Sequence, residues 1–367
     1  MTTALQDYFE SIGISREALS RTGINSVRLD ELLTGSDPTI DEIRAISREL
    51  GISSRHLISR RQKLNLDRLK RRQNYSVDDF RAFTETADIA DRAHELSRHL
   101  PERIDLKYTV ALEEDARDFE RAEQLAHFGR QVVLKVSELD PLLNLDRLLI
   151  KSTSVYMIVD QFRAVEGATL SANGRQFIFL AERPDPRMRF TLAHEFAHYL
   201  VDVLEDNQGW FDEDVNRPHP EERKAERFAN AFAAALLMPA IAIGRALAVF
   251  RRRYNVKGDT ISDVELVFLA RMFGVNFQVA ARRCEDLKLM PRGGGQSLYS
   301  NVIKKYKSPE RLADSFGLPP RIVYDWSSWG HFLADRIRPA VMDADISLGR
   351  LSELVGLPID ALQEKLL

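Results

Sequence analysis

Apolar residues recur at helical spacing along most of the chain. Near the N-terminus this spacing predicts a compact bundle of short helices over residues 15–22, 25–33, 40–50 and 54–58. Longer helices are predicted over residues 78–100, 113–136, 187–203 and 221–237, and helical patterning continues from 298 to the end. Residues 154–159 and 176–180 are instead rich in Val, Ile, Tyr and Phe, which is typical of strands. The pattern therefore predicts an α+β fold that is mostly helical and contains a small sheet.

The dipeptide Asn173-Gly174, just before the second of these strand runs, favours a two-residue turn. Residues 154–159 and 176–180 are therefore candidates for a hairpin pair. The second run is either an internal strand or an edge strand. An edge strand could pair with an extended peptide through its free backbone groups.

Shifts in composition suggest where the chain divides. Residues 60–72 are strongly basic, and the helices after them have mostly charged outer faces, which favours a helical connector. Residues 291–297, Pro-Arg-Gly-Gly-Gly-Gln-Ser, are typical of a flexible linker. We therefore expect a helical module, a helical connector, a central domain and a helical C-terminal module at residues 1–60, 61–107, 108–290 and 298–367. The C-terminal module is expected to serve recognition or sensing and to lie outside the central core.

The composition is that of a globular protein: 367 residues, 44% of them apolar, are enough for two or three domains. Lys and Arg number 52 against 55 Asp and Glu, so no overall positive charge draws the chain to nucleic acid or anionic lipid. The single cysteine, Cys284, excludes an intramolecular disulfide and fits a reducing compartment. The N-terminus lacks the pattern of a secretory signal, and no apolar stretch is long enough for a membrane span. We expect a cytoplasmic protein without a membrane partner.

The motif His194-Glu195-Phe196-Ala197-His198 carries the strongest chemical signal. Helical residues four apart lie on one face, so both imidazoles can reach a single tetrahedral zinc ion. Glu195 then projects beside the metal and can act as general base on a bound water. A helix with two partly exposed histidines and no metal is the alternative interpretation.

A catalytic zinc ion needs a third protein ligand and one open position. The helix predicted over residues 221–237 offers Glu226, whose apolar neighbours recur on one face and can pack against the histidine-bearing helix. Glu222, one turn earlier, and His219, in the preceding loop, are the competing candidates.

Two blocks around these residues, 189–200 and 226–239, resemble the signature blocks of the ImmA/IrrE family of metallopeptidases. Residues 269–275 resemble the helical segment that follows in the same family, and the likeness spans residues 108–290. One departure is Ala197, where the family usually has glycine. The resemblance implies a gluzincin-like zinc endopeptidase that cleaves a repressor-type regulatory protein in stress response, mobile-element control or phage defence.

The N-terminal helices resemble the Cro/repressor-like (XRE) helix-turn-helix family, on positions that include Leu19 and Gly23. In such a module the second helix reads DNA, and its exposed start would present Asn25, Ser26 and Arg28. Residues 1–59 contain more acidic residues than arginines and no lysine, which does not favour a phosphate backbone. Protein docking or dimerisation is the alternative use of this module.

Two classes of function follow from these observations. In the first, the protein is a zinc endopeptidase whose partner is a protein substrate, expected to be a helix-turn-helix repressor. In the second, it is a DNA-binding regulator or antitoxin-like protein whose metallopeptidase domain serves sensing or partner binding. DNA and a second copy of the chain, in a homodimer, are further candidate partners.

The acidic loop over residues 206–220, between the two metal-bearing helices, is expected to limit access to the site.

Overall fold

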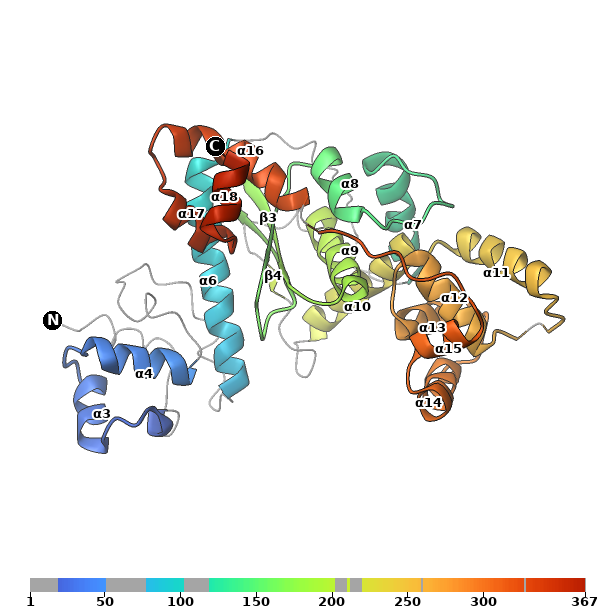
Figure 1. The fold of residues 1–367 in the computed structure, drawn as a ribbon, viewed down its shortest axis with the longest axis horizontal. Helices are drawn as coiled ribbons and strands as arrows, with labels where there is room; N and C mark the ends of the chain where they lie inside the picture. The colour runs from blue at the N-terminus through green and yellow to red at the C-terminus, as the bar shows by residue number, and fades with distance from the viewer. Residues whose placement is uncertain are drawn as a thin grey trace. The chain divides into compact units, whose positions relative to one another are not determined.

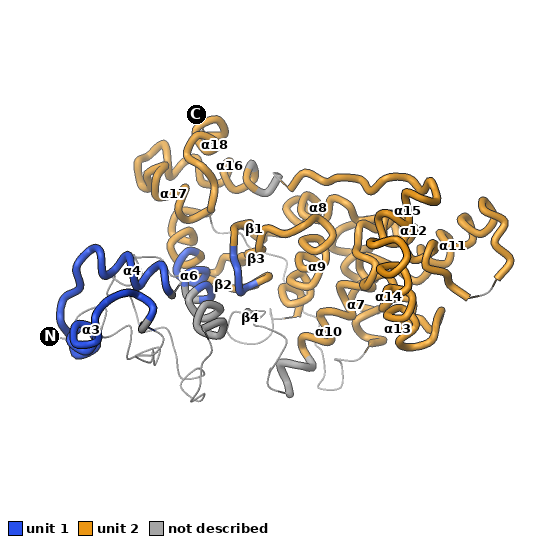
Figure 2. Tube along the Cα trace, turned by 60° about the horizontal axis from the view of Figure 1, so that its bottom comes forward, with its two compact units in different colours: residues 1–92, 162–165 blue, residues 93–161, 166–367 orange. Residues whose placement is uncertain are grey.

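Helices make up most of the structure (Figure 1), a computed structural model that describes residues 19–50, 77–101, 119–201, 210–211, 220–258, 260–326 and 328–366. The chain forms two compact units (Figure 2), residues 1–92 with 162–165 and residues 93–161 with 166–367. One small sheet belongs to the second unit. The prediction of a mostly helical α+β fold is confirmed.

The first unit contains the short N-terminal helices η1 (Ser20–Thr22), α3 (Ser26–Leu33) and α4 (Ile40–Leu50), and part of the long helix α6 (Val77–His99). Asn25 caps α3, because its side chain accepts a hydrogen bond from the backbone N–H of Arg28. Thr39 and Glu42 each accept from the other's backbone N–H, which forms a capping box at the start of α4. The helices predicted over residues 25–33, 40–50 and 78–100 are confirmed. Residues 15–18, 54–58 and the basic stretch 60–72 lie outside the described residues.

The sheet of the second unit has the strand order β1-β3-β2-β4. Its strands are β1 (Tyr156–Asp160), β2 (Gly167–Ala172), β3 (Arg175–Ala181) and β4 (Trp210–Phe211). β3 pairs parallel with β1 and antiparallel with β2, and β4 pairs antiparallel with β2. In this register Ile178 of β3 lies opposite Met157 of β1 and Thr169 of β2.

The predicted hairpin between residues 154–159 and 176–180 is wrong. Asn173 and Gly174 do form the tight turn, with φ angles of 48° and 74°, but the turn joins β2 to β3. β1 lies parallel to β3, and a two-residue turn cannot connect parallel strands. The edge interpretation of residues 176–180 is also wrong, because β3 is paired on both sides.

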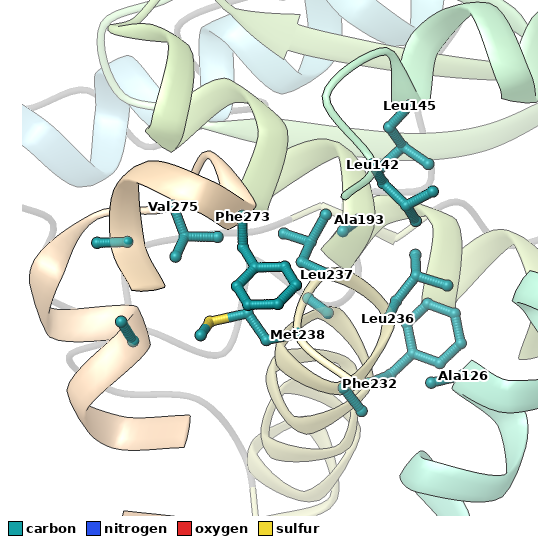
Figure 3. Packing of buried hydrophobic residues seen from close by; sticks show 14 of the residues in the cluster. Ala126, Leu142, Leu145, Ala193, Phe232, Leu236, Leu237, Met238, Phe273 and Val275 are labelled. Atoms are coloured by element: carbon teal, nitrogen blue, oxygen red, sulfur yellow. The ribbon is translucent and has the colours of Figure 1, made fainter. Parts of the chain in front are cut away.

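The helices of the second unit are α7 (Phe119–Phe128), the π-helix η4 (Gly129–Val133), α8 (Leu145–Ser152), α9 (Asp185–Val201), α10 (Pro220–Leu237), α11 (Ala240–Tyr254), α12 (Asp263–Phe273), α13 (Phe277–Asp286), α14 (Gly294–Tyr306), α15 (Pro309–Ser315), α16 (Ser328–Met342), α17 (Leu348–Val355) and α18 (Ile359–Leu366). α10 packs against α7 and α9, and α9 packs against β2 and β3. Figure 3 shows part of the resulting core, with Phe232 and Leu236 of α10, Ala193 of α9 and Phe273 of α12. The helices predicted over residues 187–203 and 221–237 are confirmed as α9 and α10.

Residues 291–297 are not a flexible linker. Gly293 is the N-cap of α14, and Gly294 and Gly295 are its first residues. Gly295 is buried against α13, where an added Cβ would lie 2.6 Å from the Cβ of Ala281. Glycine therefore serves close helix packing here, and α14 and α15 contribute Val302, Leu312 and other residues to the core cluster that contains α9 and α10. The first part of the predicted C-terminal module thus belongs to the central core.

Within the described ranges, no single helix is both long and apolar enough to cross a membrane. Two bent pairs, α10 with α11 and α12 with α13, meet that length and composition only when joined, with bends of 46° and 107°. Both pairs contribute side chains to the core cluster.

Candidate metal centre

Helix α9 is buried on nearly all sides, and this holds its polar residues in place. Most of its apolar residues belong to the core cluster or pack against it. The polar residues of the motif are buried as well, since His194, Glu195 and His198 keep only 4%, 1% and 5% of their surface exposed. Buried polar groups require partners, so the contacts of these three residues define what the site can do.

The N-terminal turn of α9 is anchored by Arg189, which is fully buried. Its guanidinium donates hydrogen bonds to the backbone carbonyls of Gly274 and Leu143, and it pairs with Asp185 at 2.8 Å. Asp185 also accepts a hydrogen bond from the indole N–H of Trp326. Segments far apart in the sequence therefore fix the position of the helix that carries the motif.

Two helices bring three potential ligand atoms together. The Nε2 atoms of His194 and His198, one turn apart on α9, are 3.1 Å from each other. Glu226 of α10 places Oε2 3.0 Å from Nε2 of His194 and Oε1 3.3 Å from Nε2 of His198. Ligand atoms of the three residues all lie within 4.8 Å of one another, and the described residues contain no other group of this kind. The structure thus gathers the three residues that the sequence predicts as metal ligands.

The two competing candidates for the third ligand cannot be compared with Glu226. His219 and the side chain of Glu222 lie outside the part of the chain that the structure describes. Apart from the two residues of β4, the same holds for residues 206–219 of the acidic loop.

The charge states of these groups suit metal binding. Burial alone would raise the pKa of Glu226, but hydrogen bonds from His194 and His198 lower it to about 2. Burial lowers the pKa of His198 below its usual range, although Glu226 opposes the shift. At neutral pH Glu226 is therefore ionised and His198 neutral. These are the forms in which carboxylate and imidazole bind a metal.

The donor set fits a divalent transition metal. Two imidazole nitrogens and one carboxylate oxygen are a ligand set found in catalytic zinc sites of hydrolases. Three protein ligands leave a fourth position for water or substrate. The cluster could therefore hold an ion that remains accessible to a reacting group.

Asn230 contacts the ring nitrogen of His194 that does not face Glu226. It lies one turn after Glu226 on α10, and its Oδ1 is 3.1 Å from Nδ1 of His194. When His194 binds a metal through Nε2, its hydrogen lies on Nδ1 and can be donated to Oδ1 of Asn230, which would hold the ring in that tautomer.

The Asn230→Ala substitution should weaken metal binding by about 10-fold, because His194 loses the partner that fixes its ring and tautomer. The Asn230→Asp substitution should retain affinity, since it keeps an acceptor oxygen. Competition with a chromophoric chelator measures both variants. Equal affinity of the alanine variant and the unchanged protein would show that Asn230 does not orient the ligand.

Two residues beside Glu195 were not predicted from the sequence. The hydroxyl of Thr169 donates to Oε2 of Glu195 at 2.7 Å, and Gly167 lies against the same carboxylate. Both belong to β2, whose sequence Gly-Ala-Thr-Leu-Ser-Ala lacks the bulky residues that identify strands. The only local signal was the turn at Asn173-Gly174, which implies a strand on each side.

The residues predicted to contact DNA belong to the first unit, and Asn25 and Arg28 make contacts within it. Asn25 caps α3. The guanidinium of Arg28 pairs with Glu42 at 2.7 Å and with Glu31 at 2.9 Å, and the hydrogen bond from Arg28 helps to lower the pKa of Glu42 to about 2. DNA contacts by Asn25, Ser26 and Arg28 stay a prediction. To contact a DNA phosphate, Arg28 would have to break its ion pairs with Glu42 and Glu31.

A comparison with protein families finds a match over the region that carries this cluster. Residues 153–285 match the family model Peptidase_M78, described as an IrrE N-terminal-like domain. The match includes the sheet, the helices α9 and α10 that carry the three candidate ligands, and most of α13. This match supports the resemblance to the ImmA/IrrE family that the blocks at 189–200 and 226–239 predict. A search of curated proteins finds no match to the chain.

The family match supports a peptidase function of the metallopeptidase type. Its His194, His198 and Glu226 cluster is the place where a metal ion could bind. The match does not include the N-terminal helices, so their resemblance to Cro/repressor-like proteins stays a prediction.

Proposed function

We propose that the protein is a zinc-dependent endopeptidase that cleaves a regulatory protein of the repressor type. The observation that carries this proposal is the convergence of His194, His198 and Glu226 on one point, with Glu195 beside them on a buried helix. Three ligands with an open position are typical of catalytic rather than structural zinc sites. A complete donor set on the two helices, one of which also carries the buried Glu195, favours hydrolysis over a domain that serves only sensing or partner binding.

A zinc ion at this position would polarise the scissile carbonyl and lower the pKa of a water bound to it to about 7. With the metal in place, Glu195 would accept a proton from the attacking water and deliver it to the leaving amine. Asn230 keeps His194 in the tautomer that presents Nε2. The surrounding core holds α9 still, so the carboxylate and the imidazoles keep their spacing during the reaction.

The repressor-type substrate is supported by the family resemblance, since members that cleave repressors act in stress response, mobile-element control or phage defence. Incubation with a proteome-derived peptide library, followed by mass spectrometry, would define which bonds are cut. Incubation with helix-turn-helix proteins encoded beside this chain would then test the substrate class. Cleavage of library peptides but of none of these proteins would refute the repressor proposal and leave the peptidase proposal intact.

We expect one zinc ion per chain in the purified protein, and loss of that zinc in the His194→Ala variant. The His127→Ala variant is a matched control, because His127 lies on α7 with an exposed ring that pairs with Glu138. Removal of His194 should reduce zinc affinity by more than the roughly 10–100-fold that loss of an outer partner costs. Elemental analysis measures the metal content. A folded protein that cleaves peptides without bound metal would contradict the proposal.

A further inference from the structure

Strand β2 contacts the carboxylate of Glu195 through Gly167 and Thr169. Gly167 and Thr169 are two positions apart on this strand, so they occupy the same face of the sheet. That face is packed against α9. Both residues are within the described second unit and are buried.

Thr169 fixes one oxygen of the carboxylate. Its hydroxyl is 2.7 Å from Oε2 of Glu195 and 3.1 Å from the backbone carbonyl oxygen of the same residue. A threonine hydroxyl has one proton to donate, and an ionised carboxylate is the stronger acceptor at the shorter distance. Thr169 is only 3% exposed, so water cannot readily take over this hydrogen bond.

Gly167 leaves room for the other oxygen. An added Cβ would lie 2.5 Å from Oε1 and 2.9 Å from Cγ of Glu195, and 2.7 Å from Cγ2 of Thr191. Real Cβ atoms essentially never approach other atoms this closely. A side chain at position 167 would therefore force Glu195, Thr191 or the strand to shift, which would disturb the contact between the carboxylate and Thr169.

We propose that Gly167 and Thr169 form a carboxylate seat on β2 that positions Glu195 for proton transfer at the metal centre. This proposal rests on the proposed function, in which Glu195 is the general base. A flexible glutamate needs such support, because a misplacement of about 1 Å can reduce a catalytic rate by about 100-fold. Gly167 and Thr169 are positioning residues, since they act through Glu195.

The first experiment removes only the hydroxyl. The Thr169→Val variant keeps the shape of the side chain, Thr169→Ser restores the hydroxyl, and Glu195→Gln serves as reference. Thr153→Val is the matched control, because Thr153 is also buried and its hydroxyl donates to the backbone carbonyl of Leu149. Zinc content and the midpoint of thermal unfolding are recorded for every full-length variant.

The first readout is binding of acetohydroxamate to the zinc-loaded proteins, measured by calorimetry. A hydroxamate chelates the metal through two oxygens and gives its acidic proton to a neighbouring base, so its affinity reports the position of Glu195. We expect Thr169→Val to bind about 10-fold more weakly, with full zinc content, because a hydrogen bond to a charged group is lost. Thr169→Ser should bind within about threefold of the unchanged protein, and Thr153→Val should bind normally.

The second readout is hydrolysis of a peptide that the unchanged protein cuts. Thr169→Val should lower kcat by about 10- to 100-fold with little change in KM, because the substrate does not touch Thr169. If Thr169 had only a structural role, Thr169→Val would lower the stability of the protein. It would not lower kcat at an unchanged KM, and Thr169→Ser would not restore activity.

A second pair of variants tests the other half of the seat. Gly167→Ala should weaken acetohydroxamate binding at least as much as Thr169→Val. Gly244→Ala is its control, because an added Cβ on α11 meets nothing within 4 Å. If Glu195→Gln binds weakly but Thr169→Val and Gly167→Ala bind normally, the carboxylate seat is refuted and the proposed function stands. If Glu195→Gln itself binds as tightly as the unchanged protein, Glu195 does not face the metal and both proposals fail.

Discussion

The Glu195→Gln substitution should leave zinc and fold in place and slow peptide hydrolysis by about 10²- to 10⁴-fold, the contribution typical of a general base. Glutamine is nearly isosteric with glutamate, and its amide oxygen can still accept the hydrogen bond from Thr169 that Glu195 accepts at 2.7 Å. The amide cannot take the proton of the attacking water. The Glu195→Gln variant should therefore keep its zinc but lose most of its peptidase activity.

The measurement is the rate of cleavage of a peptide identified from the library, at equal zinc content. Glu182→Gln is a matched control, since Glu182 is an exposed glutamate at the end of β3 and should tolerate the same change. A Glu195→Gln protein that retains zinc and cleaves at the rate of the unchanged protein would assign the base to another group.

The grouping of the three candidate metal ligands was predictable because local geometry determines most of their arrangement. The four-residue spacing of His194 and His198 places both rings on one helical face in any α-helix. Glu226 required one further step, the packing of its helix against α9, and the apolar face of that helix indicated this contact. The structure brings all three together at 3.0–3.3 Å.

The seat beneath Glu195 could not be predicted in the same way. β2 consists of small residues with little intrinsic preference for a strand, and it becomes a strand because its partners β3, β4 and α9 surround it. Gly167 and Thr169 acquire their roles only from that long-range packing. The missed strand also explains the wrong hairpin, since the turn at Asn173-Gly174 was assigned to the nearest strand that the pattern did identify.

The glycine run at 293–295 was misinterpreted for a related reason. Glycine is favoured in flexible linkers, but it is also favoured where two backbones approach closely. Sequence composition does not distinguish these cases. The packing of α14 on α13 does, because it leaves no space for a Cβ at Gly295.

This packing predicts that a chain ending at Gln296 will lose both its cooperative fold and its zinc. Such a truncation removes Val302, Leu312 and Ala313, all fully buried in the cluster that includes α9 and α10. It also removes the acidic partners of Arg271, a residue of α12 that pairs with Glu310 of α15 at 2.7 Å. Loss of even one large buried side chain costs about 2–5 kcal/mol, and whole domains are stable by only about 5–15 kcal/mol.

Thermal unfolding and elemental analysis of the truncated protein measure this effect, and a pair of point variants supports the interpretation. Leu312→Ala should lower the free energy of unfolding by about 2–5 kcal/mol, because the side chain is fully buried. Phe316→Ala, at a residue of 51% exposure just after the same helix, should change the free energy of unfolding by less than about 1 kcal/mol.

A chain ending at Gln296 that unfolds cooperatively at the normal midpoint with one zinc bound would contradict the truncation prediction and show that α14 and α15 are dispensable for the core. The peptidase core would then end near residue 290, as the glycine run first suggested, and the close packing at Gly295 would have no part in holding the metal centre.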